Sequence, residues 1–283
     1  MTSGTPLIRL VYAFLWFGCA IPVTLFAQEF SPFSPAFILE RGAVQSSTSL
    51  GVNWYNGQSS TTISNGSQKI SSVAGSEFLS VGLPNDIQVG VGIAYSDWVS
   101  KSPSTLNVGA GFSNPNLFAK KVWFGDTDAR LNLTLGVAPN TENTGLRGLG
   151  TRYNAGLAGV FILDQSLVGT FGATQFVSDK NGAYQTPNET QLSGAISKAF
   201  DFYLVNFALR ASRFDSQLIT QGYRQSNYGL GGNLQLSRQF ATNVWGAIAY
   251  DISGSNSTFV YGANDYRNKN LNNSLLTTVN ILF

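Results

Sequence analysis

The sequence contains no histidine and only one cysteine, Cys19, among its 283 residues. Without histidine there is no imidazole base at neutral pH, so the Ser-His and Cys-His nucleophile pairs of many hydrolases are excluded. The chain also has no HExxH motif, no cysteine cluster and no glycine-rich phosphate loop. The sequence therefore predicts no enzyme, no metal site and no cofactor.

Charged residues are also scarce, at 11% of the chain, whereas an average soluble domain has about 25%. The net charge of +2 is too small to predict a nucleic-acid partner. After residue 27 there is no run of about 20 apolar residues, the length that a transmembrane helix needs. Glycine and aromatic residues are abundant instead. This combination is typical of a membrane β-barrel, whose strands alternate apolar and polar side chains.

The first 27 residues have the pattern of a secretory signal peptide. Arg9 precedes an apolar run over 10–20, Pro22 interrupts the run, and Ala27 offers a small residue for cleavage. Cleavage there would remove Cys19, so the mature chain would have no thiol chemistry. A single membrane anchor is an alternative, although the apolar run is short and broken.

A lipoprotein modified at Cys19 is another alternative, but Trp16 and Phe17 suit that signal poorly. Residues 28–45 contain two Ser-Pro pairs and show no clean period. We expect them to form a periplasmic N-terminal segment or a partial plug of the lumen.

From residue 46 to 283, segments of period two recur between turn-rich stretches. Short turns, such as 84–86 and 239–241, alternate with long polar loops, such as 56–70, 100–114 and 254–272. This asymmetry predicts a transmembrane antiparallel up-and-down β-barrel of all-β class, with both termini in the periplasm. The twelve predicted strands are 46–56, 74–83, 87–98, 115–124, 129–140, 153–163, 167–177, 190–200, 203–214, 226–238, 242–253 and 272–283.

Alternation assigns one face of most strands to the lumen. A Lys or Arg facing lipid at mid-membrane costs about 2–4 kcal/mol, so Arg130 and Arg210 should face inward. The predicted pore-lining residues are Asn53, Arg130, Asn132, Asn206, Arg210, Asn233, Gln235, Asp251 and Asn280. The facing of strands 74–83, 115–124 and 167–177 stays open.

The inward residues could line a weakly anion-attracting path or fill the interior. A barrel of about eight strands is filled by side chains and one of about sixteen is open, so twelve strands do not decide between the two. Inward glycines such as Gly90, Gly92, Gly136 and Gly231 leave room and favour a path.

Aromatic residues on the apolar face gather at the strand ends. We expect them to form two rings at the membrane interfaces, where amphipathic rings are favoured. The alternative is that aromatics are simply common in strands, as in a soluble sandwich. The predicted interface aromatics are Trp54, Tyr95, Tyr153, Phe200, Tyr203, Tyr228, Tyr250 and Phe283.

The chain ends in an alternating strand whose apolar face includes Val279, Ile281 and the terminal Phe283. This ending resembles the C-terminal signature of bacterial outer-membrane proteins. The resemblance implies that the three residues form an assembly signal, recognised by the barrel-assembly machinery.

The stretch FLSVGLPNDIQVGVGIAYSDW, with Gly82-Leu83 and Asp86, is similar to a hairpin of the phenol-degradation meta-pathway family of outer-membrane transporters. NPNLFAKKVWF and RLNLTLGVAPNT resemble that family's next hairpin, although this chain departs from the family pattern at Lys120 and Lys121. The resemblance covers about residues 70–283. It implies transport of aromatic or other poorly soluble compounds and supplies no site residues.

Together these observations predict an outer-membrane channel of a Gram-negative-type bacterium for passive uptake of a small, aromatic or hydrophobic solute. Its expected partners are outer-membrane lipid, the assembly machinery and the solute. The alternative is a structural or surface-interaction barrel whose extracellular loops bind a partner. The acidic residues in turns, such as Asp126 and Asp128, are ordinary turn chemistry, and a loop Ca²⁺ site at Asn264 and Asp265 has no further support.

Overall fold

The computed structural model describes residues 37–60, 65–125, 129–140, 150–164, 166–179, 187–200, 203–219, 222–224, 227–261 and 264–283. The predicted signal peptide and residues 28–36 lie outside the described residues. Within the described ranges no helix is both long and apolar enough to cross a membrane.

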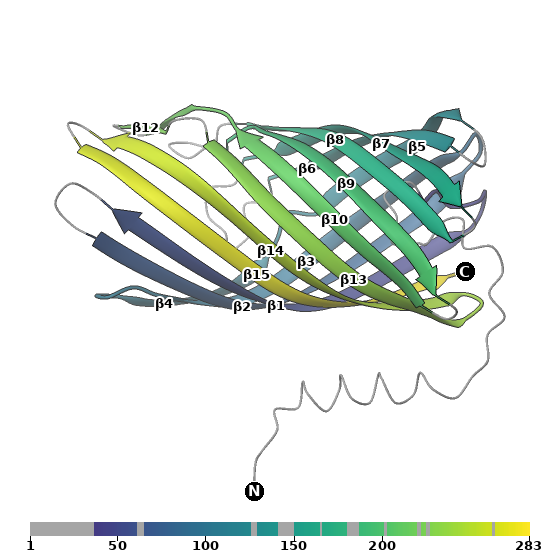
Figure 1. The fold of residues 1–283 in the computed structure, drawn as a ribbon, viewed down its shortest axis with the longest axis horizontal. Helices are drawn as coiled ribbons and strands as arrows, with labels where there is room; N and C mark the ends of the chain where they lie inside the picture. Colours follow the sequence, from purple (N-terminus) through teal and green to yellow (C-terminus); the bar gives the residue numbers. More distant parts are fainter. Residues whose placement is uncertain are drawn as a thin grey trace, which may run out of the picture.

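The described chain is built from antiparallel strands (Figure 1). Their bounds are β1 Val44–Ser60, β2 Asn65–Leu83, β3 Ile87–Lys101, β4 Leu106–Phe112, β5 Asn116–Gly125, β6 Ala129–Ala138, β7 Arg152–Asp164, β8 Leu167–Ser178, β9 Glu189–Phe200, β10 Tyr203–Phe214, β11 Gln217–Ile219, β12 Gly222–Arg224, β13 Asn227–Ala241, β14 Val244–Tyr261 and β15 Asn264–Leu282.

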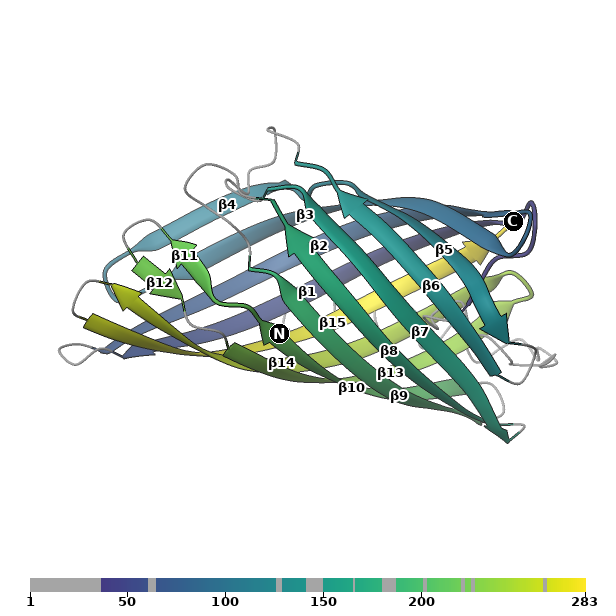
Figure 2. The ribbon, with the colours of Figure 1, turned by 90° about the horizontal axis from the view of Figure 1, so that it is seen from above.

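Twelve of these strands pair in sequence order around a closed barrel, seen from the side in Figure 1 and from above in Figure 2. Three short strands stand outside this ring, since β4 pairs only with β3 among the described strands and the β11–β12 hairpin is joined to β14. The prediction of a closed all-β antiparallel barrel of about twelve strands is confirmed.

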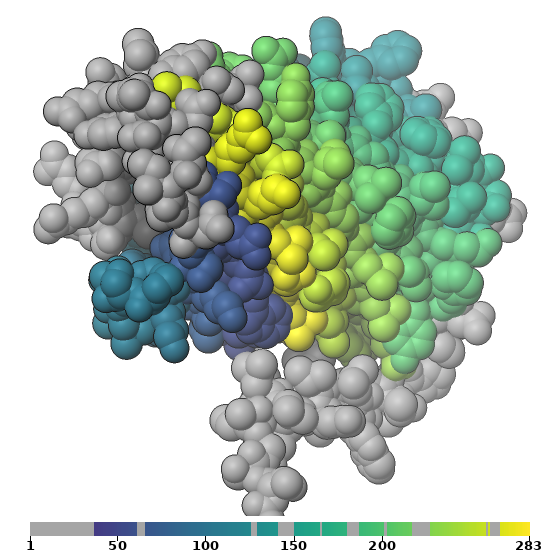
Figure 3. Space-filling view, turned by 60° about the vertical axis from the view of Figure 1, so that its left-hand side comes forward, coloured from purple at the N-terminus to yellow at the C-terminus, as the bar shows by residue number. Residues whose placement is uncertain are grey.

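The first and last barrel strands close the ring. They pair from Gln45 with Leu282 to Ser60 with Arg267, and Figure 3 shows β1 (purple) directly beside β15 (yellow). At the turn-side end, the Val44 amide donates to the Phe283 carbonyl at 3.0 Å, and the Phe283 amide donates to the Val44 carbonyl at 2.8 Å. Closure satisfies backbone groups that an open sheet edge would leave unpaired in lipid.

Several predicted loops are wrong, because the strands continue through them. The predicted loops 56–70 and 254–272 are largely the ends of β1, β2, β14 and β15, and β4 lies within 100–114. The predicted turn 239–241 still belongs to β13, which carries a register irregularity between Gln239 and Ala241. The distal ends of β1 and β2 are polar on both faces, so no apolar alternation marks them as strands, yet ladder hydrogen bonds form without it.

The barrel has an inverted distribution of side chains. Leu50, Leu236 and Ile252 are exposed on the outside, as are many other large apolar residues. The largest fully buried side chains of the described chain are instead polar, namely Asn132, Ser237 and Asn280. A soluble domain buries apolar residues and exposes polar ones. This barrel is therefore organised around a polar interior and an apolar exterior.

Candidate solute path

Register pairs show which side chains share the inner face. Gln235 pairs with Ala249, Ala249 with Leu276, and Leu276 with Gly51, so these positions of β13, β14, β15 and β1 project together into the lumen. Their neighbours one residue away, such as Leu236 and Leu50, project outward. The same reading across β3, β5 and β6 sets Gln88, Lys120 and Thr134 on the inner face.

All nine predicted lining residues project toward the lumen, but their surroundings differ. Asn132 and Asn280 are fully buried, and Asn280 accepts a hydrogen bond from Gln45 Nε2 at 3.1 Å. Asn53 donates to Ser72 Oγ at 3.1 Å, and Asn206 accepts from Ser197 Oγ at 2.9 Å. The remaining five, Arg130, Arg210, Asn233, Gln235 and Asp251, are half-buried. The predicted set therefore combines residues that pack the wall with residues that face open space.

The inward glycines do not leave the open space that the sequence suggested. A Cβ on Gly90 would lie 2.6 Å from the Phe118 ring, and one on Gly92 would lie 2.5 Å from the Phe78 ring. The two rings have centroids 6.3 Å apart. The glycines thus make room for phenylalanine rings that lie flat along the wall, and part of the lumen is filled.

At the turn-side end, the chain before β1 lies inside the barrel wall. Lys120 Nζ donates to the Phe37 carbonyl at 3.0 Å, and the Leu39 amide donates to Gln88 Oε1 at 3.3 Å. Leu39 is only 3% exposed. Both partner side chains are inward, so residues 37–40 occupy lumen space at this end.

Gly82 of β2 is required for that arrangement. A Cβ there would lie 1.9 Å from the Glu40 carbonyl oxygen, closer than any real contact. The Gly42 amide also donates to the Gly82 carbonyl at 2.9 Å. The close approach of the two backbones therefore depends on the missing side chain.

Toward the loop-side end, an ion-pair cluster lines the wall. Arg152 Nη2 lies 2.8 Å from Glu189 Oε2, and Ser212 Oγ donates to the other carboxylate oxygen of Glu189 at 2.8 Å. Arg152 also lies over the Phe176 ring, with its Cζ 4.3 Å from the centroid. A second ion pair joins Arg210 of β10 to Asp251 of β14, with Arg210 Nη2 2.8 Å from Asp251 Oδ1.

Glu189, Ser212 and Arg210 of this cluster border a cavity of about 230 Å³. Its lining includes Glu189, Gln191, Arg210, Ser212, Phe214, Tyr55 and Asn270. Tyr55 donates its hydroxyl hydrogen to Asn270 Oδ1 at 2.6 Å, which holds the ring against β15. The cavity offers both charged groups and aromatic faces, the usual combination in a small-molecule site.

The inner face of the described strands carries more positive than negative charge. Lys120, Arg130, Arg152 and Arg210 project inward, and the inward carboxylates are Glu189 and Asp251. The low dielectric constant of the surrounding protein concentrates the electric field of such groups inside the lumen. The geometry can therefore attract anionic solutes weakly.

Alternation in the sequence did not place Lys120, Arg152 and Glu189 in the lumen. Arg152 and Glu189 each stand one residue before a predicted strand, so they were assigned to loops. Lys120 lies in the strand whose facing was open, because Lys121 follows it. The sequence does mark one of this pair as inward, since both cannot share a face.

The eight predicted interface aromatics all lie exposed on the outer face. Phe200, Tyr203 and Phe283 stand beside the short turns or the chain end, and Trp54, Tyr95, Tyr153 and Tyr228 lie along the opposite half of their strands. Tyr250 lies in the turn-side half of its strand instead, because β14 continues to Tyr261. Phe112 of β4 adds to the second group, with its ring centroid 5.0 Å from that of Tyr95.

No protein-family model matches the chain, and no curated protein matches its sequence. Solved structures do share its fold. An outer membrane channel from Pseudomonas putida F1 is 12% identical, with a TM-score of 0.54, over 90% of this chain and 100% of the other. The TodX monoaromatic hydrocarbon channel (deltaS2 mutant) is 7% identical, with a TM-score of 0.47, over 87% and 91% of the two chains. The Escherichia coli outer membrane protease OmpT is 9% identical, with a TM-score of 0.39, over 85% and 97%.

Proposed function

We propose that the chain is a channel of the outer membrane of a Gram-negative-type bacterium, through which a small organic solute passes without energy input. The observation that supports this most strongly is the inverted barrel, with an apolar outer face, two groups of exposed aromatics and a polar interior. An apolar band flanked by aromatic girdles matches the thickness and interfaces of a bilayer.

The path begins at the loop-side cavity and narrows toward the periplasm. In the narrow half, the Gln45 side chain on β1 donates a hydrogen bond to Asn280 on β15, and Leu39 is buried near Gln88. In this proposal residues 37–43 act as a partial plug, and the barrel wall itself begins at Val44.

The solute class follows from what lines the cavity. Arg210 supplies positive charge, and Arg152 is held beside the cavity by its ion pair with Glu189, while the Tyr55 and Phe214 rings supply apolar faces. A small aromatic or hydrophobic molecule that carries a carboxylate would satisfy both. The family resemblance noted in the sequence points to the same aromatic class.

Planar-bilayer recording of the purified, heat-modifiable protein tests the path. We expect small single-channel steps with a preference for anions, together with swelling of proteoliposomes in small aromatic carboxylates such as benzoate. Folded protein that gives neither conductance nor swelling would contradict the proposal.

Removing the Arg210 charge should change ion selectivity. Arg210→Gln takes one positive charge from the cavity wall, so the anion-to-cation permeability ratio should fall by about two- to threefold, as expected for a partly screened charge. The reversal potential in a salt gradient measures this ratio. Arg210→Gln combined with Asp251→Asn is the matched control, because it removes the ion pair but keeps the net lumen charge. A ratio that falls equally in both variants would contradict the charge argument.

The surface-interaction alternative has one observation in its favour. Leu106 and Val108 of β4 are 67% and 71% exposed, on a strand that stands off the barrel (Figure 3). If this is the functional surface, Leu106→Ser with Val108→Ser should abolish cell-surface partner binding and leave conductance unchanged. Unchanged binding in a pull-down with that variant would count against the alternative.

A further inference from the structure

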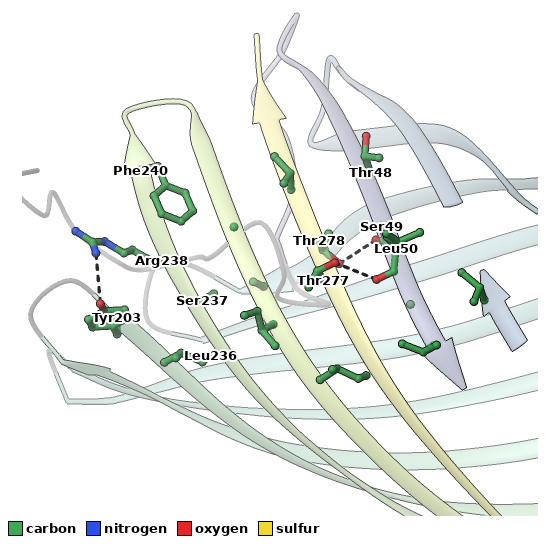
Figure 4. Close-up of a pocket in the computed structure, with 18 residues that line it drawn as sticks. Thr48, Ser49, Leu50, Tyr203, Leu236, Ser237, Arg238, Phe240, Thr277 and Thr278 are labelled. Carbon is green, nitrogen blue, oxygen red and sulfur yellow. Dashed lines mark hydrogen bonds between the residues drawn. The ribbon is translucent and has the colours of Figure 1, made fainter. Parts of the chain in front are cut away.

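The outer face carries an apolar groove of about 240 Å³ across β10, β13, β14, β15, β1 and β2 (Figure 4). Its banks are formed by the outward side chains Leu50, Val52, Leu236, Ile248 and Leu275. Its floor includes Gly246, which pairs with Arg238 on one side and Val279 on the other. The groove exists because a glycine and small residues stand between larger apolar ones on neighbouring strands.

One end of the groove carries a cation at the level of the short turns. Arg238 lies three residues before the end of β13, and Tyr203 begins β10. Arg238 Nη1 donates to the Tyr203 hydroxyl at 3.3 Å, and its Cζ lies 5.3 Å from the Tyr203 ring and 5.9 Å from the Phe240 ring (Figure 4). The aromatic contacts hold the guanidinium at the rim of the groove.

A carboxylate lies beside the other end, where Glu77 contacts the lining residue Thr48. A single register row runs from Arg238 through Gly246, Val279 and Thr48 to Glu77. Arg238 and Glu77 therefore stand four strand spacings apart, a distance of about 19 Å. Glu77 accepts hydrogen bonds from the hydroxyls of Ser46, at 2.6 Å, and Thr48. An anion is therefore favoured at the Arg238 end and opposed at the Glu77 end.

We propose that this groove binds a glycerophospholipid of the periplasmic leaflet, with one acyl chain along the apolar floor and the headgroup phosphate on Arg238. Arginine suits this role because its planar guanidinium donates two parallel hydrogen bonds to a phosphate. The site needs the barrel to lie in a membrane but does not need it to conduct, so it stands apart from the proposed transport.

A phospholipid fits this surface better than a second protein copy does. A stable protein interface buries about 1,200–2,000 Å², whereas the groove is narrow and has its cation at one end only. A flexible chain with an anionic end matches that shape and charge. A homodimer at this face is the competing outcome that the experiment must separate.

The test uses native mass spectrometry on the full-length folded protein, delipidated in a non-ionic detergent. Dioleoyl phosphatidylglycerol or dioleoylglycerol, which lacks the phosphate, is added at equal concentration. We expect one retained phosphatidylglycerol per barrel. Retention of dioleoylglycerol should be lower by about tenfold, the order expected for one lost charge-assisted hydrogen bond. Equal retention of the two lipids by the wild-type protein would overturn the proposal without any variant.

Two variants and one control locate the site. Arg238→Gln should lose the preference for phosphatidylglycerol, and Gly246→Leu should lose retention of both lipids because its side chain occupies the groove. Arg213→Gln, which removes an exposed outward arginine from the far end of β10, should behave as wild type. Each variant is checked for the heat-modifiable band. A preference for phosphatidylglycerol that survives in Arg238→Gln, lipid retention that survives in Gly246→Leu, or a dimer mass that either variant abolishes would overturn the proposal.

Discussion

Truncation of the chain after Ser274 is expected to remove nearly all folded barrel from the outer membrane. Residues 275–282 pair with β1 on one side and β14 on the other. Their loss leaves two unpaired strand edges in the apolar layer, and each unsatisfied backbone group there costs several kcal/mol. The heat-modifiable band of the membrane fraction measures the effect, and we expect it to disappear.

Single substitutions distinguish closure of the barrel by β15 from recognition of the chain end by the assembly machinery. Phe283→Ala keeps the backbone bonds to Val44 but removes the outward ring, so it should lower the folded band several-fold if Val279, Ile281 and Phe283 form the assembly signal. Leu282→Ala, whose side chain lies on the inner face, is the matched control. Equal losses in the two variants would mean that packing, and not the outward face, sets the yield.

Gly82→Leu is expected to raise conductance several-fold while leaving the barrel folded. Its side chain would occupy the place of the Glu40 carbonyl, so residues 37–43 could no longer lie against β2. Single-channel recording measures the opening. Gly75→Ala on the same strand is the control, since a Cβ there meets only the Ser49 carbonyl at an ordinary 3.8 Å.

Crosslinking can show the displacement directly. Leu39→Cys with Gln88→Cys should be joined by a short bifunctional thiol crosslinker in the otherwise wild-type barrel, because the Leu39 amide bonds to the end of the Gln88 side chain, and should not be joined when Gly82→Leu is added. Unchanged conductance together with intact crosslinking would contradict a plug at this position.

The barrel could be predicted because its central strands alternate strictly. In β6, Leu131 and Leu133 face outward and Asn132 and Thr134 face inward, and Asn132 is buried whereas the outward Leu135 is exposed. The distal halves of β1 and β2 could not be predicted in this way. Their side chains are polar on both faces, so only backbone pairing, which leaves no mark in the sequence, makes them strands.

The candidate site was predictable only where one strand sufficed to place a residue. Arg210 could be set inward from the cost of a lipid-facing charge alone. The place of the Lys120 ammonium depends on its hydrogen bond to the Phe37 carbonyl, 83 positions away in the sequence. The Arg152–Glu189 ion pair likewise joins residues 37 positions apart. Such contacts arise from the barrel's curvature and register. The crowding of Gly90 and Gly92 by phenylalanine rings has the same origin.

The uneven strand lengths give the barrel an oblique rim. β1 continues six residues beyond Trp54, whereas β6 ends one residue after Val137, the partner of Tyr153. At about 3.4 Å per residue, the β1 side extends roughly 20 Å further along its strand than the aromatic level, and the β6 side hardly extends at all. With the outer aromatics at the lipid boundary, one flank of the strand wall extends well beyond that boundary, while the opposite flank stops close to it. A fluorophore at Ser60 should therefore be quenched by water-soluble agents, and one at the outward-facing Val137 by lipid-bound agents.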